Sequence, residues 1–228
     1  MQSPTQQQGS RLLIRLGVYT QSRVGIDPRT RPLLVLLTAK TDDLRIKLRA
    51  REDADEQVII TEAGADASDE GFDSAFMAFA DAVKNAAGRN YNSPLYKKIL
   101  PHGTVRYTQP RLFDQVTAGG DLFRHLDLPE VKQEPIVQEH RPKLEAKLDE
   151  LKKSLNPYQQ SVERVAVLRG AEYLSRAAFI RTYTATFGGV LAAVGTKQEA
   201  ERFFRRFRAE PDADEDQEPE AGDDPKTK

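Results

Sequence analysis

The residues of this chain that could do metal or catalytic chemistry are few and scattered. It has three histidines, His102, His125 and His140, and no cysteine. None of the histidines follows a glutamate at the i, i+3 spacing that helical bundles use for a di-iron centre, and the adjacent Glu139 and His140 would point about 100° apart on a helix. The absence of cysteine excludes a disulfide framework, thiolate zinc sites, cysteine-ligated iron–sulfur clusters and a cysteine nucleophile. We therefore expect neither a metal nor a cofactor.

Carboxylates close together in sequence are the nearest approach to an acid–base set. They are Glu139, Glu145, Asp149 and Glu150. Lysines stand among them, as is typical of a solvated helix face. The sequence also lacks the motifs of phosphate loops, dinucleotide-binding folds, nucleophile elbows and zinc proteases. We expect a protein that is not an enzyme.

Basic residues interleaved with aromatic residues form the first of two candidate anion-binding regions. Such a combination can hold phosphates while aromatic rings stack on nucleic-acid bases. The other interpretation is that the tyrosines cap a helical hairpin while the lysines face water. The candidate contacts in this region are Lys97, Lys98, Arg106 and Arg111.

Four arginines near the carboxyl end form the second candidate region. They surround Phe203, Phe204 and Phe207, a pattern that could dock on a partner or a membrane surface. We expect instead that the phenylalanines close the end of a helical bundle, because the acidic residues that follow would screen the arginines and repel an anionic surface. The arginines are Arg202, Arg205, Arg206 and Arg208.

Two long stretches with heptad spacing, 28–88 and 131–194, must position these residues. Paired with each other they give a long antiparallel helical hairpin. Folded back at Gly64–Gly71 and at Pro157 they give an up-down four-helix bundle. At Pro157 either a new helix begins or one long helix bends, and the unbroken apolar register favours the bend. Both architectures are all-α.

The remaining segments are shorter and less regular. Residues 1–10 and the acidic tail 209–228 are polar and predicted to be disordered. The segment 11–26 is an irregular or helical leader, and Thr196 is typical of the start of an end helix over 197–208. The connector 89–130 is rich in turn-forming residues and predicted to hold two or three short helices, one capped by Ser93 and one near 111–117. We expect residues 11–208 to form one helical-bundle domain.

Composition agrees with a modest soluble protein. The chain has 228 residues, a formal net charge of −1 and 39% hydrophobic residues without tryptophan, which indicates a thin core. The net charge averages unlike parts, since the tail is strongly acidic and the rest is basic. No signal peptide is evident, and the longest apolar runs are far shorter than the ~18–20 residues that cross a bilayer. We expect a cytoplasmic protein with no membrane span.

These observations predict a function in binding. The first hypothesis is a non-enzymatic structural or protein-interaction bundle that self-associates, as coiled coils do, through its heptad-spaced apolar faces. A different protein partner would use the same faces. The alternative is a nucleic-acid-binding protein that uses the connector and the arginine-rich last helix.

Overall fold

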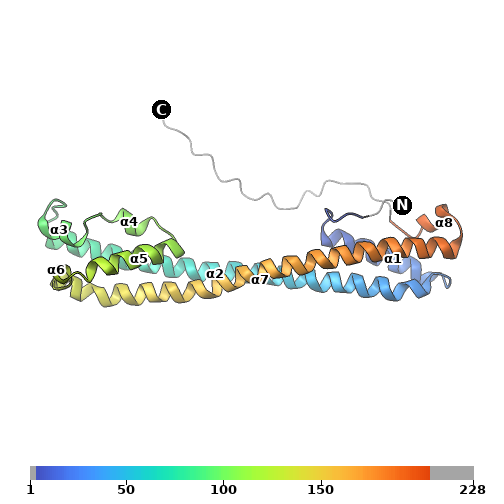
Figure 1. Ribbon diagram of the computed structural model, residues 1–228, viewed down its shortest axis with the longest axis horizontal. Coiled ribbons are helices and arrows are strands. Elements are labelled where there is room, and N and C mark those ends of the chain that lie inside the picture. The colour runs from blue at the N-terminus through green and yellow to red at the C-terminus, as the bar shows by residue number, and fades with distance from the viewer. Residues whose placement is uncertain (1–3, 206–228) are drawn as a thin grey trace, which may run out of the picture. The chain divides into compact units, whose positions relative to one another are not determined.

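The computed structural model describes residues 4–205, and 82% of them are helical with no strand. The predicted all-α class is therefore confirmed. The elements, in chain order, are α1 (Ser10–Ile26), η1 (Arg31–Leu33), α2 (Leu34–Ala86), α3 (Pro94–Ile99), α4 (Val105–Thr108), α5 (Phe113–Leu126), α6 (Pro129–Lys132), α7 (Pro135–Val194) and α8 (Lys197–Glu201) (Figure 1). Of the predicted lead-in 1–10, residues 4–10 are described, and the buried Ser10 already begins α1; the predicted tail 209–228 lies outside the described residues.

The two long helices are each unbroken. α2 has 53 residues and passes through Gly64, where an added Cβ would meet no atom within 4 Å. α7 has 60 residues and contains both Pro142 and Pro157. A new helix starting at Pro157 was therefore the wrong alternative. Each proline removes one backbone hydrogen bond, but the apolar register continues across it and keeps the helix packed.

The chain divides into two compact units. Unit 1 comprises 1–41 and 178–228, and unit 2 comprises 42–177. Both α2 and α7 contribute residues to each unit.

Unit 2 contains the larger hydrophobic core, where α2 and α7 pack with the helices of the connector. Phe76 lies at its centre, with ring centroids 6.3 Å from Phe79 and 5.3 Å from Tyr107 of α4. Gly119 lets α5 approach α7 closely, because a Cβ there would lie 2.7 Å from Leu148 Cδ1. The core continues to Leu155 on α7.

Three helices, α3, α4 and α5, lie wholly within the connector 89–130, in line with the two or three predicted, and α6 begins at its end and runs to Lys132. The predicted cap is confirmed, since the Ser93 side chain accepts a hydrogen bond from the Tyr96 N–H at 3.1 Å. α5 is longer than expected because Gly119 and Gly120 continue the helix. Glycine is needed at position 119 because Leu148 packs closely there, and not because the chain turns.

Unit 1 contains the leader, which is helical as α1 and packs tightly. A Cβ on Gly17 would lie 2.5 Å from Thr41 Oγ1, and Thr20 Oγ1 donates to Tyr183 Oη at 3.3 Å. Phe204 is buried, with ring centroids 5.2 Å from Tyr183 and 5.3 Å from Phe187. Of the three phenylalanines predicted to pack inward, Phe204 is thus buried, Phe203 is partly buried and Phe207 lies outside the described residues.

The end helix is shorter than predicted. α8 begins at the expected cap, where Thr196 Oγ1 accepts from the Glu199 N–H, but it ends at Glu201 instead of at residue 208. The chain leaves the helix there and places Phe204 against α7, and residues 206–208 lie outside the described range.

Within residues 4–205, α7 is long enough and apolar enough to cross a membrane. An 18-residue window within it has a mean hydropathy of 1.3, and 28% of that window is buried. This is weak evidence for a span, since core helices of soluble proteins meet the same criterion. A search for uninterrupted apolar runs misses it, because polar residues divide the window.

Candidate functional site

Two of the four predicted connector cations are paired with carboxylates in unit 2. Lys98 Nζ lies 2.6 Å from Glu134 Oε1, and Arg106 Nη2 lies 3.2 Å from Asp121 Oδ2. Lys97 and Arg111 are exposed. Half of this predicted set therefore has its charge balanced within the fold.

The aromatic residues of the same region divide in a similar way. Tyr107 and Tyr96 are buried, and Tyr107 packs on Phe76. Tyr91 is exposed, packs edge-on against Tyr96 at 5.1 Å and lies beneath Lys84 Nζ at 5.0 Å. Stacking on bases would be open to Tyr91 and Phe113 but not to the two buried tyrosines.

The arginine-rich set belongs to the other unit. Arg202 and Arg205 are exposed after α8, while Arg206 and Arg208 lie outside the described residues. The two predicted sets of cations therefore belong to different units.

A buried polar cluster in unit 2, absent from the sequence-based predictions, joins α2 to the connector. Gln115 of α5 is fully buried, and its Nε2 donates to Asp73 Oδ1 at 2.8 Å and to the Tyr107 carbonyl at 2.7 Å. The Leu112 N–H donates to Asp69 Oδ1 at 3.3 Å. Leu112 has φ +51°, which is uncommon for a branched side chain. The cluster therefore fixes how the connector re-enters a helix.

Burial changes the acidity of both aspartates. Desolvation is the largest cause, and it raises the pKa of Asp73 to about 6, with the nearby Asp69 raising it further and Arg111 opposing. Desolvation also raises the pKa of Asp69 above its ordinary value, against the hydrogen bond from Leu112. The Asp73 carboxyl thus titrates near neutral pH.

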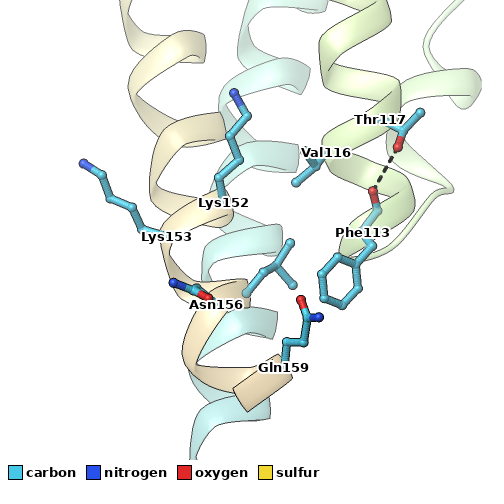
Figure 2. Close-up of a pocket in the computed structure, with 8 residues that line it drawn as sticks. Phe113, Val116, Thr117, Lys152, Lys153, Asn156 and Gln159 are labelled. Carbon is cyan, nitrogen blue, oxygen red and sulfur yellow. Dashed lines mark hydrogen bonds between the residues drawn. The ribbon is translucent and has the colours of Figure 1, made fainter. Parts of the chain in front are cut away.

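A cleft of about 680 Å³ lies between α5 and α7 in unit 2 (Figure 2). Its lining combines apolar, amide and ammonium groups: Phe113, Val116, Thr117, Lys152, Lys153, Leu155, Asn156 and Gln159. Thr117 Oγ1 donates to the Phe113 carbonyl at 3.2 Å, so this hydroxyl serves its own helix. Figure 2 shows the ammonium groups of Lys152 and Lys153 directed away from the Phe113 ring.

A buried ion-pair network joins α2 to α7 in unit 2. Glu172 is 2% exposed, and its carboxylate lies 2.8 Å from Arg51 Nε and 3.0 Å from Arg176 Nη2. Further along the same helices, the hydroxyls of Thr61 and Ser161 share a hydrogen bond at 2.8 Å. Polar contacts therefore take up part of the interface that apolar packing fills elsewhere in unit 2.

No group of three or more histidine, cysteine, aspartate or glutamate side chains within residues 4–205 could hold a metal ion. Comparison with known protein families, with curated proteins and with solved structures found no match to this chain.

Proposed function

We propose that the protein is a non-enzymatic, cytoplasmic interaction protein that self-associates through one part of unit 2. We name this part the paired stretch and define it as residues 42–64 of α2 and 158–177 of α7. No buried residue of the hydrophobic core cluster lies in the paired stretch, although the partly buried Tyr158 packs against the cluster.

The contacts of the paired stretch support an antiparallel arrangement of its two helices. Ser175 Oγ donates to Asp43 Oδ2 at 2.6 Å near the start of the α2 segment, and Thr61 contacts Ser161 near its end. Between them, Arg169 Nη2 lies 3.5 Å from Asp55 Oδ1. Partners on α7 thus move backwards as α2 advances, which is the order of an antiparallel coiled-coil pair.

Exposed aliphatic side chains are the observation that carries the proposal. Two helices bury one stripe each, and seven large apolar residues of the paired stretch remain at least two-fifths exposed. They are Ile46, Ile59, Ile60, Val162, Val167, Tyr173 and Leu174. A surface that retains so many apolar side chains is typical of a face covered in an assembly.

Charge complementarity favours a second copy of this chain as the occupant. The α2 segment carries seven acidic and four basic residues, whereas the α7 segment carries three basic and two acidic residues. When two copies pair so that the α2 segment of one meets the α7 segment of the other, opposite charges face each other.

Sedimentation equilibrium tests the proposal. The wild-type chain is expected to be a dimer at micromolar concentration, and a double variant, Ile60→Ser with Leu174→Ser, is expected to be a folded monomer. The matched control, Val105→Ser with Leu128→Ser, changes two exposed apolar residues of unit 2 outside the paired stretch and should remain dimeric. A monomeric wild type, or a dimer that the paired-stretch variant leaves intact, would contradict the proposal.

The nucleic-acid alternative has weaker support. Lys98 and Arg106 are engaged with carboxylates, and two of the four aromatic residues that could stack on bases are buried. Among the described residues, its remaining candidate contacts are Lys97 and Arg111 in unit 2, with Arg202 and Arg205 in unit 1.

A further inference from the structure

The turn between α1 and α2 in unit 1 forms a tied corner, which we define as residues 23–36. Thr30 is fully buried, and its Oγ1 donates to the Val24 carbonyl at 2.8 Å. Arg31 Nε donates to the Gly25 carbonyl at 3.4 Å, and a Cβ on Gly25 would lie 3.5 Å from Leu34 Cδ2. These contacts hold the end of α1 against the start of α2.

Three aliphatic side chains project from this corner into solvent. Ile26 is 72% exposed, Val35 is 77% exposed and Leu36 is 57% exposed, whereas Val24 and Leu37 beside them are fully buried. The buried pair already supplies the packing between α1 and α2. The exposed trio therefore adds nothing to the core of unit 1, and water covers it in the isolated chain.

The described residues of unit 1 carry an excess of positive charge, and three of its arginines, Arg23, Arg29 and Arg31, belong to the corner. The described part of unit 1 carries ten lysines and arginines against three acidic residues, a net charge of +7, while unit 2 carries twenty against twenty-three. Two of the three acids, Asp27 and Glu199, lie 2.8 and 3.6 Å from Arg29. Arg23 and Arg31 are exposed at the corner and form no ion pair with another residue of the range 4–205.

The part of α7 that belongs to unit 1 is mostly apolar and carries little charge. The segment 178–194 of α7 holds one charged residue, Arg181. A surface that combines exposed aliphatic tips with unpaired arginines matches the boundary between lipid headgroups and acyl chains. A nucleic acid would engage the arginines but would leave the aliphatic trio in water.

We propose that unit 1 docks on an anionic lipid surface through this corner. Ile26, Val35 and Leu36 enter the headgroup–acyl boundary, and Arg23 and Arg31 contact lipid phosphates. The full chain has a net charge of −1, so attraction by total charge is excluded and any preference for anionic lipid must come from this local surface.

Co-sedimentation of the full chain with vesicles tests the proposal. We expect binding to vesicles of phosphatidylcholine with phosphatidylserine, and at least ~10-fold weaker binding to phosphatidylcholine alone. Val35→Ser with Leu36→Ser should weaken binding to the mixed vesicles by a similar factor, and Arg23→Gln with Arg31→Gln should remove the lipid preference. Far-ultraviolet circular dichroism confirms that each variant is folded, and Val105→Ser with Leu128→Ser in unit 2 serves as the matched control that should bind normally.

Absence of binding to the mixed vesicles, or binding that both corner variants leave unchanged, would overturn the proposal. A third outcome would also overturn it: the chain binds a DNA or RNA oligonucleotide but no vesicles. In that case Arg23→Gln with Arg31→Gln would abolish oligonucleotide binding, and Val35→Ser with Leu36→Ser would preserve it. Sedimentation equilibrium of the corner variants without vesicles should give the wild-type mass, which separates this result from the self-association of unit 2.

Discussion

Replacing Asp73 by asparagine should change how the stability of the fold depends on pH. The carboxyl of Asp73 receives a hydrogen bond from Gln115 and lies near Asp69, and its pKa is raised to about 6 by desolvation and by that neighbour. Asparagine keeps an oxygen that accepts from Gln115 but removes the titrating proton. The variant therefore isolates the cost of ionising this carboxyl inside the cluster.

The sign and size of the effect follow from linkage. The folded state holds the Asp73 proton more tightly than the unfolded state, whose pKa is near 3.8, so the contribution to stability is largest at low pH and is lost as pH rises through about 6. Each pKa unit corresponds to about 1.4 kcal/mol. Because the side chain is partly exposed, solvent screening reduces the effect, and we expect about 1 kcal/mol to be lost between pH 5 and pH 7.5.

Urea unfolding monitored by circular dichroism at a series of pH values measures this difference. Wild type should lose about 1 kcal/mol more than Asp73→Asn over that interval, since the two proteins share every other ionisable side chain. Asp81→Asn, an exposed carboxylate on the same helix, is the matched control and should follow the wild type. Parallel profiles for wild type and Asp73→Asn would refute the assignment of a raised pKa to this carboxyl.

Three further substitutions test the packing and the ion pairs, all by chemical unfolding. Gly119→Val should destabilise the fold by about 1–3 kcal/mol, because its side chain would overlap Leu148, whereas Gly170→Ala should stabilise it by about 0.5–1 kcal/mol, because the added methyl meets no atom within 4 Å; equal effects would contradict the packing at Gly119. Glu172→Ala should cost about 1–3 kcal/mol, since it leaves Arg51 and Arg176 without their shared carboxylate but still partly hydrated; no loss would mean that the network is solvated.

Much of the helical architecture could be predicted from spacing alone. The apolar register through Pro157 predicted one continuous helix, because packing along a long stripe outweighs one lost backbone hydrogen bond. Ser93 and Thr196 predicted the starts of α3 and α8. The end of α8 and the length of α5 were missed, because they depend on contacts of Phe204 and Gly119 with α7, far away in sequence.

The polar cluster was missed for a similar reason, although one signal was available. Asp69 stands three residues before Phe72 and seven before Phe76, so a carboxylate occupies the apolar stripe of α2. A charged residue on a core face calls for a partner, and the spacing of α2 alone does not identify the Leu112 N–H, 43 residues later, as that partner. The partners of Lys98 and Arg106 are likewise set by the fold of the connector.

The net charge of the chain is near zero because acidic and basic residues are concentrated in different segments and cancel only in the sum. Unit 1 is cationic through its described residues, unit 2 is slightly anionic, and residues 206–228 carry nine acidic and four basic residues. Random mixing would let each charge find a local counter-ion, as Lys98 and Arg106 do in unit 2. The described residues of unit 1 hold three acids for ten cations, and at the corner the exposed Arg23 and Arg31 stand near exposed aliphatic residues. Self-repulsion among like charges opposes folding unless a counter-charge is supplied, and an anionic lipid surface of the kind we propose for the corner would supply one.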